Sequence, residues 1–174
     1  MTAKIIDGKA FAASLRARIG EQAAKLKSEH GLVPGLATVL VGSDPASEVY
    51  VRNKGKAAEA LGFHSAHVSL PDDASEDAVL REVRRFNDDR QVHGILVQLP
   101  LPKQVREAAV LDTLDPKKDV DALTPYNAGL LLGGRAKLVS CTPTGVMLML
   151  KETLGDIAGM NALVIGRSLL FGKP

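Results

Sequence analysis

Two side chains on one predicted helix have the types and the spacing for proton transfer. Tyr50 and Lys54 are four residues apart, so a helix places them on the same face. A phenol beside an ammonium group is a familiar acid/base pair. The same pair also arises by chance on an exposed helix, and spacing alone favours that interpretation. The position of the helix, directly after a buried strand, shifts the balance towards a functional pair.

Three further polar residues end or follow predicted strands. Gln98 ends an otherwise apolar strand and could hold a neighbouring group by hydrogen bonds, although a simple strand-ending residue fits equally well. Asp119 and Asp121 would face the same side of an extended segment. They suggest a metal or a cationic ligand, but two carboxylates without a nearby His or Cys are weak support. A solvated acidic turn, in which the two carboxylates balance the charges of Lys117 and Lys118, is the better interpretation.

The other candidates for chemistry are one cysteine and four histidines. Cys141 has no partner for an internal disulfide, which indicates a reducing, cytoplasmic setting. It is expected to be a small buried hydrophobic residue rather than a nucleophile. The histidines, at positions 30, 64, 67 and 93, have no metal-binding spacing with it and are expected to be structural. No metal site is predicted.

The composition excludes several classes of protein. The chain has 174 residues, with 22 Lys and Arg against 20 Asp and Glu and 45% apolar residues, which is typical of a globular protein with its own core. A net charge of +2 and few aromatic residues give no reason to expect nucleic-acid binding. The uncharged runs at 122–134 and 138–150 are too short to span a bilayer. The N-terminal sequence does not predict a secretory signal.

Strands and helices are expected to alternate along the first two thirds of the chain. Apolar residues three and four apart predict a helix over 11–26, ended by Gly31. Strands are predicted at 36–41, 63–70 and 93–98, and helices up to Leu61, over 75–88 and over 104–114. Asp73 and Glu76 have the spacing of a capping box. This alternation implies a parallel sheet covered on both faces, with ligands at the carboxyl ends of its strands.

The sequence changes character after Asp121. A Gly-rich connection leads to a predicted helix over 141–155, with Thr142 as N-cap and Pro143 at its first position. A buried strand is predicted over 161–166. The turn that follows, GRSLLFGKP, matches the dinucleotide-binding fingerprint at Gly166 alone, so by pattern it is a weak signal.

Six segments occur in a characteristic order: PGLATVLVG, SEVYVRNKGKAAEALG, GILVQLPLP, KDVDALTPYNAGLL, CTPTGV and GRSLLFGKP. Together they resemble the family of bifunctional methylenetetrahydrofolate dehydrogenase/methenyltetrahydrofolate cyclohydrolases, over nearly all of 34–174. Three residues depart from the family pattern. Ala122 stands where the family usually has Gly, Ser140 where it has Pro, and Phe171 where it has Val. None removes an expected catalytic group, although Phe171 could crowd the cofactor turn.

The resemblance implies a fold and a division into domains. We expect an α/β catalytic and folate-binding domain over 1–122, with three layers and a mainly parallel sheet. Residues 123–174 would form a linker and the incomplete opening segment of a Rossmann-type NAD(P)-binding domain. The family's cofactor domain continues well beyond GKP, so we expect the chain to be truncated in that domain.

The resemblance also implies the site. Lys54 would be the catalytic lysine, with Tyr50 flanking the folate ring and Gln98 hydrogen-bonded to Lys54. Asp121 would accept the paired N–H groups of the pterin, as a carboxylate accepts from Arg. The catalytic residues implied in this way are Tyr50, Lys54, Gln98 and Asp121, and the substrate-binding residues are Tyr50, Lys54, Val97, Gln98, Leu99 and Asp121.

A cofactor turn at Gly166, Arg167 and Ser168 would bind NADP, with Arg167 as the candidate partner of the 2′-phosphate. The expected reactions are oxidation of 5,10-methylenetetrahydrofolate with NADP and hydrolysis of the methenyl product to 10-formyltetrahydrofolate. They belong to one-carbon metabolism and purine biosynthesis. The expected partners are tetrahydrofolate derivatives and a second copy in a homodimer, with no nucleic acid and no membrane, in the cytoplasm.

Two alternatives remain open. A non-catalytic folate-binding or dimerising fragment is possible because most of the cofactor domain is missing from the sequence. A short-chain-dehydrogenase-like oxidoreductase would also use Tyr50 and Lys54. It is disfavoured because its nucleotide-binding glycines would precede the Tyr, whereas the candidate turn here follows it.

Overall fold

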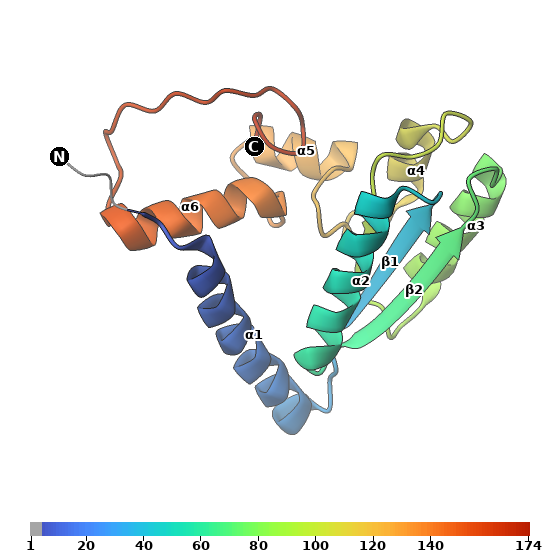
Figure 1. The fold of residues 1–174 in the computed structure, drawn as a ribbon, viewed down its shortest axis with the longest axis horizontal. Helices are drawn as coiled ribbons and strands as arrows, with labels where there is room; N and C mark the ends of the chain where they lie inside the picture. The colour runs from blue at the N-terminus through green and yellow to red at the C-terminus, as the bar shows by residue number, and fades with distance from the viewer. Residues whose placement is uncertain (1–4) are drawn as a thin grey trace.

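A parallel sheet forms the centre of the layered part of the molecule, on the right of Figure 1. The computed structural model describes residues 5–174. Its strands are β1 (Gly35–Val41), β2 (His64–Leu70) and β3 (Gly94–Val97), in the order β2-β1-β3. Val39 at the centre of β1 is paired with Val68 of β2 and with Val97 of β3. The expected α/β fold with a parallel sheet is confirmed, and these three strands lie close to the predicted ranges 36–41, 63–70 and 93–98.

Helices cover both faces of this sheet, as expected. α2 packs against β1 and β2, while α3 packs against β1 and β3 and also contacts α4. None of the helices over residues 5–174 is long and apolar enough to cross a membrane. The helices over these residues are α1 (Gly8–His30), α2 (Pro45–Ala60), α3 (Glu76–Asp88), α4 (Glu107–Thr113), α5 (Pro125–Leu132) and α6 (Cys141–Leu154).

The core explains why β1 is apolar along its whole length. Ala37, Val39 and Val41 of the strand join a buried cluster that includes Phe86 of α3. The even-numbered Thr38 lies on the opposite face, in a groove that it shares with Val51 of α2. A strand that is buried on both faces has no solvent-facing positions, so its sequence does not alternate.

The start of α2 and the end of α1 follow from their capping residues. The side chain of Asp44 accepts a hydrogen bond from the backbone N–H of Ser47 at 2.8 Å, and Pro45 occupies the first helical position. These bonds from Ser47 lower the pKa of Asp44. Gly31 ends α1 in the left-handed conformation, with φ of 65°, which a residue without Cβ adopts at little cost.

Two predicted caps are wrong. α3 is capped by Ser75, whose hydroxyl accepts from the N–H of Ala78, because Ser75 directly precedes the helix in an extended conformation. Asp73 lies in the preceding turn. α6 begins at Cys141 with Ser140 as its N-cap, rather than at Thr142. Ser140 makes no side-chain cap, and its hydroxyl instead donates to the carbonyl of Leu170 at 2.6 Å.

α1 and α6 extend from the layered part of the molecule (Figure 1). α1 was correctly predicted to end at Gly31, but it runs away from the sheet, and Ala23 is its one fully buried residue. Its first turn approaches α6, where the sulfur of Met149 lies 3.7 Å from the place of a Cβ at Gly8. The apolar face of α1 therefore covers little of the sheet.

The predicted buried strand over 161–166 is wrong. These residues form no strand, and the side chains of Leu163 and Ile165 are 87% and 86% exposed. The strands within residues 5–174 all belong to the sheet β2-β1-β3, and none runs beside this segment. Without a neighbouring strand, its backbone N–H and C=O groups have no ladder to join.

Candidate active site

The candidate site is built around a hydrogen bond between two of the predicted residues. The ammonium group of Lys54, on α2, donates to the side-chain oxygen of Gln98 at 3.1 Å. Tyr50 lies one turn earlier on the same helix, and its side chain is 59% exposed. The interpretation of Tyr50 and Lys54 as chance residues on an exposed helix therefore fails for Lys54, which is partly buried and bonded to another predicted residue.

Gln98 is held in place on both sides of its side chain. Its backbone N–H donates to the carbonyl of Val39 at 2.9 Å, which continues the pairing of β1 with β3. Its side-chain amide donates to the carbonyl of Leu99 at 2.8 Å, so the amide oxygen faces Lys54. Val97 and Leu99 line a small cavity of about 10 Å³ together with Asp121.

Asp121 reaches the same place from the turn after α4, which lies beside β3 through the bridge between Ile95 and Asp119. Burial raises the pKa of its carboxyl group, the nearby carboxylate of Asp119 adds to this rise, and the positive charge of Lys54 and a hydrogen bond from Cys141 oppose it. The turn requires an unusual backbone, since Ala122 has φ of 53°. This conformation favours glycine, which is the residue that the family pattern usually has at this position.

The expectation of a solvated acidic turn at Asp119 is wrong. Asp119 is 1% exposed, and its side chain accepts hydrogen bonds from Asn127 and from the backbone of the following residues. The ammonium group of Lys118 donates instead to three carbonyls around the end of α3, those of Phe86, Asn87 and Asp89. Among residues 5–174, no group of three or more His, Cys, Asp and Glu could hold a metal ion.

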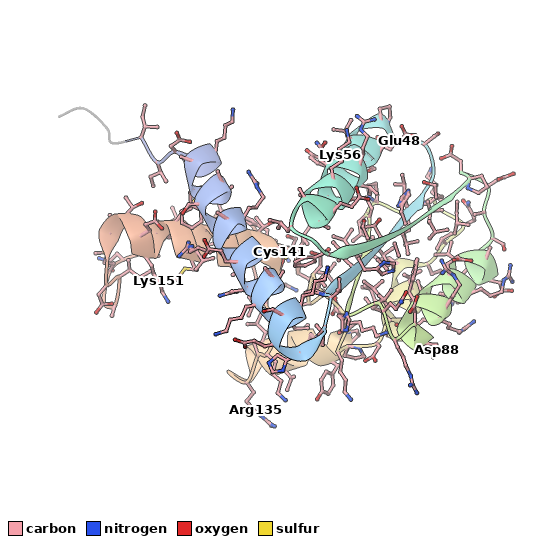
Figure 2. All side chains as sticks on the ribbon, turned by 90° about the horizontal axis from the view of Figure 1, so that it is seen from below. Glu48, Lys56, Asp88, Arg135, Cys141 and Lys151 are labelled. Carbon is pink, nitrogen blue, oxygen red and sulfur yellow. The ribbon has the colours of Figure 1, made fainter. Side chains whose placement is uncertain are left out.

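Cys141 belongs to this site, which the sequence reasoning missed. The residue is exposed rather than buried, and it lies at the end of α6 nearest the sheet (Figure 2). Its sulfur lies 3.5 Å from the carbonyl oxygen of Val120. Although the residue as a whole is exposed, its sulfur is partly buried. This burial, and then the charge of Asp121 and a hydrogen bond to it, raise the pKa of the thiol, while Lys54 lowers it. A single Cys carries no sequence signal for such a contact.

The predicted cofactor turn lies apart from these residues in the hydrogen-bond network. Gly166, Arg167 and Ser168 are exposed. The hydroxyl of Ser168 accepts from the backbone N–H of Phe171 at 3.1 Å, which closes a turn. Among the described residues, no side-chain hydrogen bond joins the three to Lys54, Gln98 or Asp121. The segment that contains the cofactor turn is attached to the start of α6, because the hydroxyl of Ser140 donates to the carbonyl of Leu170.

Comparisons with known proteins identify the family. The model of the tetrahydrofolate dehydrogenase/cyclohydrolase catalytic domain matches residues 6–121. The chain is 55% identical over 174 residues to the bifunctional protein FolD of Phenylobacterium zucineum, covering 100% of this chain and 59% of that protein. It is equally similar, with the same coverage, to the bifunctional protein FolD of Bradyrhizobium diazoefficiens. The chain therefore belongs to the tetrahydrofolate dehydrogenase/cyclohydrolase family, as the six motifs predicted.

Solved structures agree with this assignment. The Trypanosoma brucei methylenetetrahydrofolate dehydrogenase-cyclohydrolase, complexed with NADP and an inhibitor, superimposes with a TM-score of 0.93 at 38% identity. The comparison covers 99% of this chain and 59% of that one. The bifunctional enzyme FolD from Campylobacter jejuni also gives 0.93 at 38% identity, over 98% of this chain and 60% of that one. The chain thus spans about 59% of the length of the curated relatives named above.

Proposed function

We propose that this chain supplies the folate-binding, catalytic part of a bifunctional enzyme. The enzyme would oxidise 5,10-methylenetetrahydrofolate with NADP and hydrolyse the methenyl product to 10-formyltetrahydrofolate. The observation that carries the proposal is the hydrogen bond from Lys54 to Gln98 beside the carboxylate of Asp121. The names of the relatives and of the solved structures support the same reactions.

Asp121 and Tyr50 would bind and orient the folate. The two oxygens of the Asp121 carboxylate can accept both N–H groups of a pterin edge, and a paired arrangement fixes orientation as well as energy. The burial of this group limits competition from water for the same two bonds. The exposed ring of Tyr50 offers a flat apolar face on which the rest of the folate would lie, with Val97 and Leu99 completing the wall.

Lys54 would carry the proton in the hydrolysis step. Water forms a bond to the methenyl carbon and gives a proton to the Lys54 amine. The bond from that carbon to N5 then breaks and N5 takes this proton. The hydroxyl left on the carbon releases the second water proton to solvent as it becomes the C=O of the formyl group on N10. Lys54 must first release a proton from its ammonium group, and the positive charge of the methenyl substrate favours this. The bond to Gln98 would fix the direction in which the amine points.

The turn over 166–172 has features that suit a dinucleotide. A Cβ at Gly172 would lie 2.1 Å from the carbonyl carbon of Gly166, so the two backbone segments approach closely. We propose that Gly166, Arg167 and Ser168 help to bind NADP, with Arg167 as the partner of its 2′-phosphate. The chemistry that NADP would supply at this place is acceptance of a hydride from the methylene carbon. The ring of Phe171 lies 3.2 Å from the Cβ place at Gly166, which supports the expected crowding.

The division into domains is proposed on the family match. Residues 1–122 would form the catalytic domain, of which residues 1–4 lie outside the described part. Residues 123–174 would be a linker and the opening segment of an NADP-binding domain. The end of the family match at Asp121 supports this boundary. We propose a homodimer in the cytoplasm on the resemblance to the family, and for the cytoplasm also because Cys141 is the single Cys.

Substitution of Lys54 in the complete enzyme tests the proposed role. Lys54→Met keeps much of the bulk and removes the amine, so it should abolish cyclohydrolase activity and reduce dehydrogenase activity less. Hydride transfer needs no proton acceptor at this position. Lys54→Arg should also fail in hydrolysis, because a guanidinium does not release its proton at working pH. Hydrolysis by the Arg variant at near the parental rate would show that Lys54 is only a fixed positive charge.

A second candidate function applies to the 174 residues alone. The exposed segment over 161–166 and the coverage of 59% of the relatives favour a fragment that binds folate but binds NADP poorly and has little dehydrogenase activity. Calorimetry with NADP discriminates between the two candidates. Strong, saturable binding of NADP to these 174 residues would reject the second.

A further inference from the structure

Asp119 is a buried acidic residue that the proposed mechanism does not use. It is 1% exposed, and no Lys, Arg or His of residues 5–174 forms an ion pair with it. Its Oδ2 accepts from the backbone N–H of Thr124 and from the side-chain amide of Asn127, both at 2.9 Å. Its Oδ1 accepts from the N–H of Leu123 at 3.2 Å. A buried carboxyl group is costly unless such bonds compensate for the lost water.

These bonds close the turn that presents Asp121. The turn begins beside β3, where the N–H of Ile95 donates to the carbonyl of Lys118 at 2.7 Å. It continues with a bond from the N–H of Ala122 to the carbonyl of Asp119 at 3.3 Å. Asp119 therefore holds the turn through its backbone and through its carboxylate. Asp121 lies between the bond to β3 at Lys118 and the bonds from Leu123 and Thr124 to the Asp119 carboxylate. The direction of its side chain therefore depends on both attachments.

Asn127 joins the same turn to α5 and to the preceding loop. It is 4% exposed, and its side-chain amide donates to Asp119 and to the carbonyl of Pro116, in each case at 2.9 Å. Its own N–H donates to the hydroxyl of Thr124, the N-cap of α5, at 3.3 Å. Both N–H groups of one amide are thus used to connect the two sides of the loop that carries Asp121.

We propose that Asp119 and Asn127 are positioning residues that hold the Asp121 carboxylate in the orientation needed to pair with the folate. The proposal rests on the proposed function of Asp121. Paired recognition tolerates only small errors of position, so the residues that support it matter as much as the contacting group. If the support is lost, Asp121 remains present but points in several directions, and binding of the folate weakens.

Kinetics of variants of the complete enzyme test this proposal. Asp119→Asn removes the acceptor charge, and Asn127→Leu removes the bridging amide at similar volume. Both should raise the KM for the folate about tenfold or more, which corresponds to about one lost hydrogen bond to a charged group. The KM for NADP and kcat at saturating folate should stay within about twofold, because neither Lys54 nor the cofactor turn is altered. If Asn127→Leu does not fold, Asn127→Ser takes its place with the same expected direction.

Asn87 provides the matched control. Its side chain also bridges two segments, donating to the carbonyl of Thr113 at 2.8 Å and accepting from the N–H of Asp115 at 3.0 Å. Asn87→Leu should lose a similar amount of thermal stability while the folate KM stays at the parental value. A purely structural role would make the two asparagine variants alike in both measurements.

The possible failures are distinguishable. If Asp121→Asn loses folate binding while Asp119→Asn and Asn127→Leu keep the parental KM, the positioning proposal is overturned and the proposed function stands. A raised folate KM in Asn87→Leu equal to that of Asn127→Leu also overturns it. If the parent enzyme neither binds nor turns over the folate, both proposals fail.

Discussion

Replacement of Gly94 by Ala should destabilise the protein and disturb the turn that carries Asp121. Gly94 is the buried first residue of β3. A Cβ at this position would lie 2.5 Å from Cγ1 of Val120 and 3.6 Å from Cδ1 of Leu36. The first distance is far below an ordinary contact, so Val120 or β3 must move. Because Val120 lies between Asp119 and Asp121, the movement would reach the candidate site.

The clash should dominate a smaller opposing effect. Overpacking of a well-filled core costs about 1–3 kcal/mol, whereas Gly→Ala restricts the unfolded chain and returns about 0.4–1 kcal/mol. We therefore expect a net loss of about 1.3 kcal/mol, which is the difference between the midpoints of these two ranges. Gly55→Ala is the matched control. It lies inside α2, where the nearest atom to its Cβ is the Ser65 hydroxyl oxygen at 3.5 Å, and it should stabilise the helix by about 0.5–1 kcal/mol.

Urea unfolding of the two variants and the parent measures both effects, with the slope m compared to ensure that the same transition is observed. Val120→Ala added to Gly94→Ala removes the methyl group that clashes. The double variant should therefore recover part of the loss, with a coupling free energy above about 0.5 kcal/mol. A Gly94→Ala protein as stable as the parent, or purely additive effects of the two substitutions, would refute the close contact between β3 and Val120.

Three further predictions concern charged groups. Bonds from the Arg106 guanidinium and from its backbone N–H lower the pKa of Glu76 to about 2. The stability this gives is present above the usual pKa of 4.5 and is lost as the pH falls towards 2. Arg106→Gln removes the guanidinium bonds and keeps the backbone bond, so it should weaken this acid dependence of the melting temperature without abolishing it. Burial raises the pKa of Asp121, so its protonated form contributes to folding stability at low pH. This contribution is lost as the pH rises through the pKa of Asp121 in the folded protein. Asp121→Asn should therefore raise the melting temperature at neutral pH while it abolishes folate binding. Cys141 has a raised pKa through burial and Asp121, so it should react with a disulfide reagent more slowly than a free thiol at pH 7.5, and Asp121→Asn should accelerate that reaction.

The sheet could be predicted from the sequence because β1 and β3 are short apolar runs and β2 has alternating polar and apolar residues. The run over 36–41 lacks polar alternation, and the structure shows why, since β1 is buried on both faces. The segment over 161–166 has the same apolar character but no neighbouring strand. Propensity describes the fit of residues to a sheet surface and does not supply the partner. The prediction failed there for that reason.

The candidate site could be predicted in part. Lys54 could be singled out because its helix follows a buried strand, and Gln98 because it ends an apolar strand. The structure connects the two by a hydrogen bond. Asp119 was assigned to a solvated turn because two neighbouring Lys residues suggested surface ion pairs. Its actual partners are backbone N–H groups and the amide of Asn127, and sequence patterns do not show which backbone groups a side chain will meet. Cys141 was missed for the same reason.

Ala122 links stability to the proposed role of the turn. A non-glycine residue in the left-handed region costs about 1–2 kcal/mol, and Ala122 adopts φ of 53° directly after Asp121. Asp121 itself is held in a place where burial opposes its charge. Two unfavourable features therefore lie side by side at the proposed folate contact, and the bonds to Asp119 hold the turn despite them. A ligand that donates two N–H groups to Asp121 would compensate for its lost hydration, so folate binding should stabilise the protein most at pH values where Asp121 is ionised.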